Sequence, residues 1–387
     1  MDFALDPTQE ELRRLATDVF DGETTPERLR PYDPGARSAP APGHDTGIWA
    51  AVARSGLIGA ALAEDAGGTG GGAVEAAIVL REAAARGAPV PALATLALGA
   101  LPVSLCGTAA QRAALAPVAA GRRILTAGVA EPGRHDPADP ATTAVRDGAG
   151  LVVTGTKVSV PHAADADTIL VPARLDGGGT GVLLVPRDTA GLTLTPEPTG
   201  AAITAAHVGL DGARVPAEAL LGGDTTGAAA RTLRRCTLAG LAATVSGALA
   251  AALALTTEHV RTRRQFGRSL AELQAVTMKV GDIYVAARAL DAAMWAGAWR
   301  IDAPPASGEH DTDAVLAAAA LLITDQAHDA FYTAQHLHGG LGVDASYPLH
   351  RHFSTAAWAA RLLGGTEARL DALGDLAVRD TPVHAHA

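Results

Sequence analysis

The chain contains 387 residues, which is long enough for two or three domains with a large apolar core. Hydrophobic residues make up 48% but aromatic residues only 3%, so the core is expected to consist of Ala, Leu and Val in closely packed helices. The net charge of −10 argues against a nucleic-acid partner, which requires clustered basic surface.

Local features disfavour further classes of protein. Cys106 and Cys236 are too few for a disulfide framework or a cysteine-rich metal site. The N-terminus is acidic and lacks a basic segment followed by an apolar one, so we expect a cytoplasmic protein. The uncharged run from Cys236 to Thr257 is long enough to cross a membrane, but small residues dominate it and no aromatic belt flanks it. It is therefore expected to be a buried helix, with no membrane partner.

Residues 1–121 are expected to form a helical domain. Pro7 starts a helix with acidic residues in its first turn and apolar residues at helical spacing. Two further helices are predicted, from Trp49 to Leu57 and from Ala73 to Arg86.

Residues 122–224 change to short β-rich runs separated by Gly, Pro and Asp. The predicted strands are Ile124–Val129, Leu151–Gly155, Thr168–Val171, Gly181–Val185 and Leu192–Thr195. Short strands at such spacing are typical of an antiparallel barrel or sandwich. Pro216 and the glycines at 222–223 mark the end of this domain.

Residues 225–387 return to a helical pattern. Long helices are predicted at Ala228–Arg264, Leu270–Trp299 and Asp313–Leu337. A Pro-rich loop is expected at 303–308 and a frayed tail at 381–387.

Five short motifs follow one another along the chain. They are LTAGVAEPG (125–133), LVVTGTK (151–157), VPAEALLG (215–222), RRQFGR (263–268) and HLHGGLG (336–342). In this order, and over essentially the whole chain, they resemble the acyl-CoA dehydrogenase family. The resemblance implies an N-terminal helical domain, a middle antiparallel β-barrel and a C-terminal four-helix bundle. It also implies FAD-dependent α,β-desaturation of an acyl thioester.

The resemblance places the cofactor contacts in the last two motifs. The residues concerned are Arg263, Gln265, Phe266, His336, Gly339 and Gly340. A guanidinium group suits the FAD pyrophosphate, and paired glycines let the backbone approach the cofactor closely. In the family these groups act on the FAD of a neighbouring subunit. Without the motif, the arginines at 261–268 would be interpreted as a solvated cluster at a helix end.

The chain departs from the family where its own flavin and base would lie. Ser159 and Pro161 stand where the family places Trp and then Ser or Thr against the flavin ring, and proline has no backbone N–H to donate. His336 replaces the glutamine that opens its motif. Gly364 occupies one family position of the catalytic glutamate, and Thr237, which lies 26 positions before Arg263, occupies the other.

A missing base would lower the reaction rate by about 10²–10⁴, which another carboxylate of the chain could restore. Glu367, three residues after Gly364, is a weak candidate, and Glu131 is another. The alternative for Glu367 is a solvated charge at a helix start. The His-x-His pairs at 336/338 and 350/352 lack a nearby Cys or carboxylate at ligand spacing, so no metal is predicted there.

Three functions remain open at this point. The first is a heteromeric acyl-CoA dehydrogenase in which this chain lacks the glutamate, as the actinobacterial HGGLGVD…YPLHR run suggests by its resemblance to α₂β₂ enzymes. The second is a homotetrameric dehydrogenase with a displaced base, Glu367. The third is a non-redox protein that binds acyl thioesters on the same fold. The resemblance implies an acyl-CoA or acyl-carrier thioester as substrate and an electron-transfer flavoprotein as the default electron acceptor.

Overall fold

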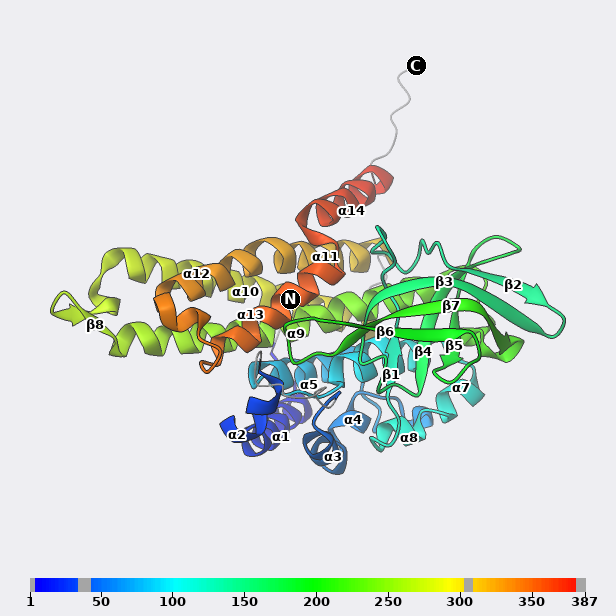
Figure 1. Cartoon of the computed structure of the whole chain (residues 1–387), viewed down its shortest axis with the longest axis horizontal. Helices are drawn as coiled ribbons and strands as arrows, with labels where there is room; N and C mark the ends of the chain where they lie inside the picture. The colour runs from blue at the N-terminus through cyan, green and yellow to red at the C-terminus, as the bar shows by residue number, and fades with distance from the viewer. Residues whose placement is uncertain (1–3, 34–42, 303–308, 381–387) are drawn as a thin grey trace, which may run out of the picture.

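The computed structural model of the chain describes residues 4–33, 43–302 and 309–380. Helices from both ends of the sequence pack beside one curled sheet from its middle (Figure 1). This is the order of elements expected from the sequence. The predicted loop at 303–308 and the predicted frayed tail at 381–387 lie outside the described residues.

The N-terminal helices are mostly short. They are α1 (Pro7–Glu23), α2 (Pro26–Leu29), η1 (Arg30–Tyr32), α3 (Thr46–Arg54), α4 (Leu57–Ala60), η2 (Glu64–Ala66), α5 (Ala73–Ala85), the π-helical η3 (Leu93–Ala100), α6 (Leu101–Cys106), α7 (Ala109–Ala113) and α8 (Ala116–Ala119). The Asp6 side chain caps α1 by accepting from the backbone N–H of Gln9. The single helix predicted at 49–57 is two helices, because Gly56 between them is left-handed with φ of 80°.

The middle of the chain forms a seven-stranded sheet with strand order β1-β4-β2-β3-β7-β6, and β5 pairs with β4. The strands are β1 (Leu125–Ala127), β2 (Thr143–Asp147), β3 (Gly150–Pro161), β4 (Thr168–Leu175), β5 (Thr180–Pro186), β6 (Leu192–Glu197) and β7 (Ala205–Pro216). The sequence patterns missed β2 and β7; β7 is rich in Ala and Gly.

The sheet is mixed, because β1 and β2 each run parallel to β4 while the other pairs are antiparallel. β2 and β3 form a hairpin, and the chain then reverses again into β4. Two successive reversals bring β4 beside β2 in the same direction, which explains the parallel pairing of Thr143 with Arg174. A short turn, η4 (Ala217–Ala219), and η5 (Leu221–Gly223) lead out of the sheet.

The C-terminal part is a bundle of long helices with a small hairpin at one end (Figure 1). Its elements are α9 (Ala228–Thr262), β8 (Arg264–Gln265), β9 (Arg268–Ser269), η6 (Leu270–Glu272), α10 (Gln274–Asp302), α11 (Glu309–Leu322), the π-helical η7 (Ile323–Ala327), α12 (His328–His338), η8 (Gly339–Val343), α13 (Leu349–Leu362) and α14 (Gly365–Asp380).

The α9 helix is the centre of the molecule and packs against α5, α10 and α13. By length and composition it could cross a membrane, but 72% of its most apolar 18-residue window is buried inside the protein, as in a core helix. Its glycines permit close packing. A Cβ at Gly240 would lie 2.3 Å from Cβ of Ala97, and one at Gly247 would lie 2.0 Å from the carbonyl oxygen of Arg81. The buried helix expected at 236–257 is therefore present.

The bundle and the N-terminal helices are also joined through a helix cap. The α5 helix begins after Gly72, which has no side chain to cap it. The Asp302 carboxylate, at the end of α10, accepts from the backbone N–H groups of Ala73 (2.7 Å) and Val74 (2.9 Å) instead. A carboxylate at a helix N-terminus is also favoured by the helix dipole, so this contact fixes the relative position of two distant segments.

Candidate active site

The hairpin that follows α9 presents three of the predicted cofactor-binding residues to solvent. Arg263 ends the helix and Gln265 lies on β8; both are exposed. Phe266 at the turn is 85% exposed and has φ of 51°, which a non-glycine residue rarely adopts. The positive φ belongs to a two-residue hairpin turn, in which Gly267 is left-handed as well (φ of 77°). The exposure of a large aromatic ring at the tip of this turn is the feature expected where a second molecule covers it.

The second group of predicted cofactor-binding residues lies at the same end of the bundle. His336, Gly339 and Gly340 are exposed around the end of α12. The rings of His259, in the last turn of α9, and His338 stack with centroids 4.5 Å apart, which connects the two segments. A Cβ at Gly340 would meet nothing within 4 Å, so the packing of this chain gives no steric reason for glycine there.

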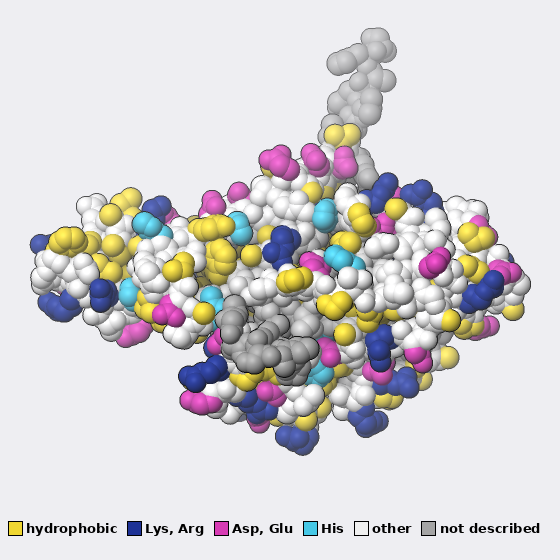
Figure 2. Space-filling model, in the orientation of Figure 1, with side chains coloured by type: hydrophobic (Ala, Val, Ile, Leu, Met, Phe, Trp, Pro, Cys, Tyr) yellow, Lys and Arg dark blue, Asp and Glu magenta, His cyan; other side chains and the backbone are white. Residues whose placement is uncertain are grey.

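These two groups are far from the chain's own sheet. Figure 1 shows the β8 hairpin at one end of the long axis and the sheet at the opposite end. Figure 2 shows Lys or Arg side chains and hydrophobic side chains together on the hairpin end. The exposed hydrophobic residues of this region include Phe266, Met278 and Val343. The hairpin therefore cannot contact a ligand held against the sheet of the same chain.

The residues at the predicted flavin position of this chain are occupied by contacts within the chain. The Ser159 hydroxyl donates to the Glu197 carboxylate at 2.7 Å and 2.9 Å. Its backbone is left-handed, with φ of 51°. Pro161 is buried and its carbonyl oxygen accepts from the Thr126 hydroxyl at 2.6 Å. The Ser159 hydroxyl is therefore engaged within the chain, and Pro161 has no backbone N–H to donate.

The cavity beside Pro161 is also too small for a flavin ring or an acyl chain. It has a volume of about 50 Å³ and is lined by helices α5 and α9, by Pro161 and His162, and by Arg351. Ligand sites usually have about 300–1,000 Å³. The cavity beside Pro161 therefore does not by itself accommodate an isoalloxazine ring.

The family base position is closed by a histidine. Gly364, between α13 and α14, has φ of 82°. A Cβ there would lie 2.5 Å from Cδ2 of His135, whose Nδ1 is 3.1 Å from the carbonyl oxygen of Leu362. Gly364 therefore lacks both a carboxylate and the space for a side chain, because the His135 imidazole fills that space.

The other base positions do not provide a carboxylate in a cavity. Thr237 is buried in α9, and its hydroxyl donates to the carbonyl oxygen of Leu233 at 2.8 Å. Glu367 is exposed in the first turn of α14, as its interpretation as a helix-start charge predicts. The geometry therefore gives no support to Glu367 as a displaced base.

Glu131 is held in a buried ion pair. Its carboxylate accepts from the Lys157 ammonium group and from the backbone N–H groups of Ala141 and Thr142. Lys157 is 1% exposed and also donates to the carbonyl oxygen of Pro172 at 2.7 Å. Burial lowers the pKa of Lys157 to about 8, although Glu131 opposes this shift. A carboxylate with three donors around it is a structural group and cannot approach a substrate.

Both histidine pairs include residues with contacts inside the fold. His338 is buried and its ring nitrogens lie 2.8 Å from the carbonyl oxygen of Ala334 and 3.1 Å from the Tyr347 hydroxyl. His350 contacts Asp33 at 3.1 Å. A different cluster was missed by the sequence analysis, because His44, His162 and Asp165 show no ligand spacing along the chain.

Comparison with known proteins agrees with this architecture. Models of the N-terminal, middle and C-terminal domains of acyl-CoA dehydrogenase match residues 6–122, 126–210 and 235–374. Acyl-CoA dehydrogenase FadE28 of Mycobacterium tuberculosis is 35% identical over 84% of this chain and 91% of its own length.

Two solved structures share the fold closely. The ChsE4-ChsE5 complex from Mycobacterium tuberculosis has a TM-score of 0.88, with 29% identity over 99% of this chain and 100% of that chain. A variant of the steroid ACAD Tcur3481-Tcur3483 has a TM-score of 0.88, with 33% identity over 97% of this chain and 99% of that chain. The expected fold class is confirmed, and the chain belongs to the acyl-CoA dehydrogenase family of oxidoreductases.

Proposed function

We propose that this chain is the subunit of a heteromeric acyl-CoA dehydrogenase that lacks the catalytic carboxylate and contributes cofactor contacts to its partner. The observation that carries the proposal is the division of the site between the two ends of the molecule. The residues that act on a neighbour's FAD are exposed at the hairpin end. The residues that would hold the chain's own flavin and base are blocked by Glu197 and His135.

The residues of this chain fit an FAD bound mainly by another subunit. Arg263 can place its guanidinium against the pyrophosphate, where a charge-assisted contact in a desolvated interface is strong. Gly339 and Gly340 allow the backbone to approach the cofactor, and Phe266 would lose its exposure on assembly. When bound, FAD would supply the acceptor for the β-hydrogen of the substrate, and the base that removes the α-proton would come from the partner subunit.

Two related proteins support an assembly of unlike subunits. ChsE4-ChsE5 is a complex, and the steroid ACAD Tcur3481-Tcur3483 carries a paired name. By this analogy the proposed substrate is an acyl-CoA thioester, the partner is a related acyl-CoA dehydrogenase chain, and the assembly is α₂β₂. An electron-transfer flavoprotein as acceptor stays a prediction.

The visible absorption spectrum tests this proposal. We expect the chain purified alone to carry no flavin, and its complex with a glutamate-containing partner chain to carry one flavin per pair of unlike chains. A full complement of FAD in the isolated chain would overturn the proposal and favour a homotetramer. A complex that forms without flavin would favour the non-redox alternative.

Arg263→Ala should weaken FAD retention by the assembled complex by about 10-fold or more. A hydrogen bond to a charged group contributes about 1.5–3 kcal/mol, and Arg263 is exposed, so its loss leaves the fold of the chain intact. Flavin affinity can be measured by equilibrium dialysis of the complex. Arg214→Ala is the matched control, since Arg214 is an exposed arginine on β7 at the other end of the molecule. Equal affinities for the two variants would refute the assignment of Arg263.

Glu367→Gln should leave the dehydrogenase activity of the complex within about twofold of the unmodified value. The reason is that the partner supplies the base and Glu367 is exposed on α14. The measurement is kcat and kcat/KM with an acyl-CoA substrate. A fall of about 10³-fold with flavin still bound would identify Glu367 as the base and contradict the proposal.

A further inference from the structure

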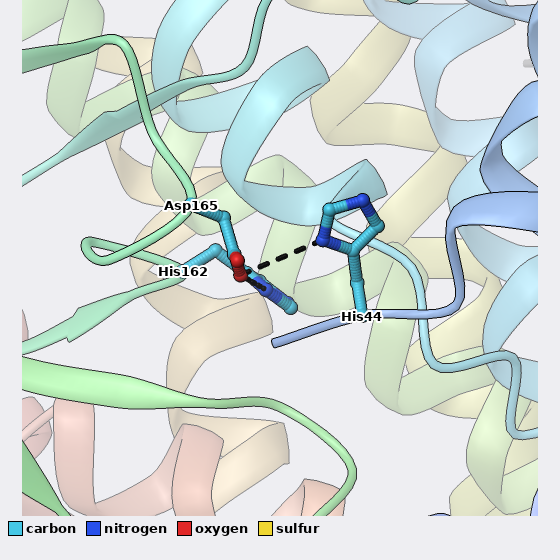
Figure 3. Close-up of side chains that lie close together, drawn as sticks. All are labelled: His44, His162 and Asp165. Atoms are coloured by element: carbon cyan, nitrogen blue, oxygen red, sulfur yellow. Dashed lines mark hydrogen bonds and ion pairs between the residues drawn. The ribbon is translucent and has the colours of Figure 1, made fainter. Parts of the chain in front are cut away.

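The cluster of His44, His162 and Asp165 joins two distant parts of the sequence. His44 lies in the loop before α3, and the other two residues lie in the turn after β3 (Figure 3). His162 is fully enclosed, His44 is largely buried and Asp165 is partly buried. In the described part of the chain, the ion pairs recorded for Asp165 are with these two histidines, so no lysine or arginine neutralises it.

We propose that these three residues bind one divalent transition-metal ion, with Zn²⁺ as the best-fitting ion, and that the ion joins the N-terminal helical part to the sheet. Two imidazoles and one carboxylate form a common ligand set for Zn²⁺. This assignment does not depend on the proposed subunit role, since none of its three residues belongs to the hairpin or to the residues assigned to the FAD of a neighbour.

The distances are compatible with a shared ion, which would replace the hydrogen bond of His162 Nδ1 with Asp165 (3.1 Å) and its contact with the Thr204 hydroxyl (3.3 Å). Zn²⁺ bonds of about 2.0–2.1 Å in tetrahedral geometry place two ligand atoms about 3.3 Å apart. Nδ1 of His162 and Nδ1 of His44 lie 3.1 Å and 3.6 Å from the same oxygen, Oδ2 of Asp165. The ligand atoms of all three residues lie within 4.8 Å of one another.

His44 supplies the observation that hydrogen bonding leaves unexplained. Its Nδ1 is buried and has no hydrogen-bond partner among the residues that the structure describes. The distance of 3.6 Å to Asp165 is too long for a hydrogen bond. A buried nitrogen without a partner costs free energy, and a metal ion between the nitrogen and the carboxylate would satisfy both groups.

The backbone around the cluster holds the three side chains in place. The backbone N–H of His162 donates to the carbonyl oxygen of Thr204 at 2.8 Å. The backbone N–H of Asp165 donates to the carbonyl oxygen of His162 at 3.0 Å. His162 has φ of 51°, an unfavourable conformation for a residue with a side chain. Gly43 makes the close approach possible, because a Cβ there would lie 2.1 Å from the Asp165 carboxylate.

His44 is positioned by the helix start that follows it. The Asp45 side chain caps α3 by accepting from the N–H groups of Gly47 (3.0 Å) and Ile48 (2.9 Å), and it pairs with Arg28 at 2.7 Å. The ligand therefore comes from a fixed segment.

Metal binding can be tested on the untagged full-length chain. His384 and His386 should first be changed to alanine, because a terminal His-x-His sequence binds metal ions by itself. Elemental analysis after dialysis against Zn²⁺ should then give one ion per chain, and competition with a chromophoric chelator gives the affinity. Zn²⁺ should raise the thermal denaturation midpoint and a chelator should reverse the rise, since the ion binds the folded state.

Two variants locate the site. His44→Ala and the isosteric Asp165→Asn should each weaken Zn²⁺ binding by about 100-fold or more, since even loss of a group that only supports a ligand costs 10–100-fold. His207→Ala is the control: His207 lies 3.8 Å from Glu197 but is 43% exposed, and its loss should change nothing. The proposal is overturned if the chain binds no Zn²⁺, if binding is weak and non-stoichiometric, or if both variants bind as tightly as the parent. If His44→Ala does not fold, Asp165→Asn and the chelator experiment on the parent chain decide whether Zn²⁺ binds at this cluster.

Discussion

Gly364→Glu should destabilise the chain by about 2–5 kcal/mol and create no dehydrogenase activity in the chain purified alone. The residue has φ of 82°, and a side chain in the left-handed region costs about 1–3 kcal/mol. Its Cβ would lie 2.5 Å from the His135 ring, and overpacking of this kind costs about 1–3 kcal/mol more. Chemical denaturation followed by circular dichroism measures the loss.

Two further variants separate the causes of this loss. Gly364→Ala adds the same Cβ without a carboxylate, so it should lose nearly as much stability. Combining Gly364→Ala with His135→Ala removes the clash and should recover only the steric part, leaving the cost of the left-handed backbone. If Gly364→Ala were as stable as the parent, the closed position inferred from His135 would be wrong.

The activity of Gly364→Glu distinguishes two cases. The chain either lacks only the catalytic carboxylate or lacks a working flavin site as well. A base must lie within hydrogen-bond reach of the α-proton, next to a flavin that accepts the hydride. Ser159 is bonded to Glu197, and the cavity beside Pro161 has only about 50 Å³. We therefore expect no bleaching of flavin absorbance when the variant is supplied with FAD and acyl-CoAs of several lengths. Rapid bleaching would show a competent flavin site and remove the main support for an unlike partner.

The sequence predicted most of the long helices because their signals are local. The α1 helix starts at Pro7, with Asp6 as its cap. The apolar run of α9 predicts a buried helix from composition alone. The points at which one helix ends and the next begins were harder to predict. Gly56 divides α3 from α4 because the chain turns back there, and glycine within a helical pattern does not by itself show that turn.

The sheet shows what a local pattern cannot provide. The strands predicted from residues 151–195 are present, but β7 was missed, because its Ala and Gly residues interrupt the β-rich pattern and the strand is stabilised by pairing with β3. The parallel pairing of β2 with β4 depends on the order in which the strands meet, which no window of sequence contains.

The candidate site was predictable only in part. The sequence predicts that Gly364 occupies a base position without a carboxylate, but the closure of that position by His135 depends on residues more than 200 positions apart. The cluster of His44, His162 and Asp165 could not be predicted because His44 lies 118 positions before His162 in the sequence. Sequence motifs show which side chains are retained or replaced, whereas the space around each replacement is a property of the folded chain.

Glu131 and Lys157 lie in two of the sequence motifs, and their role in this structure is to stabilise the fold. Both belong to motifs that resemble the family's, and the sequence analysis considered Glu131 as a substitute base. In the structure they form a buried ion pair that joins β3 to the segment after β1. A Cβ at Gly128 would lie 2.5 Å from Cγ of Lys157, so this glycine makes room for the lysine stem. The pair can therefore be kept while the flavin contacts around it change.

Lys157→Met should lower the free energy of unfolding by about 3–5 kcal/mol, because removal of one partner leaves a buried charge at Glu131 without its counterion. The urea denaturation midpoint measures this loss. Lys279→Met is the matched control, since Lys279 is the chain's one other lysine and its side chain is 55% exposed. Its surface pair with Asp282 contributes about 0–1 kcal/mol, so the control should be nearly as stable as the parent.

Combining Lys157→Met with Glu131→Gln removes both charges and should recover part of the stability. The recovery is expected because a neutral amide can still accept from the N–H groups of Ala141 and Thr142, while methionine fills most of the lysine volume. If the two losses were simply additive, the carboxylate and the ammonium group would act independently. The coupling between the two charges would then not be what stabilises this part of the fold.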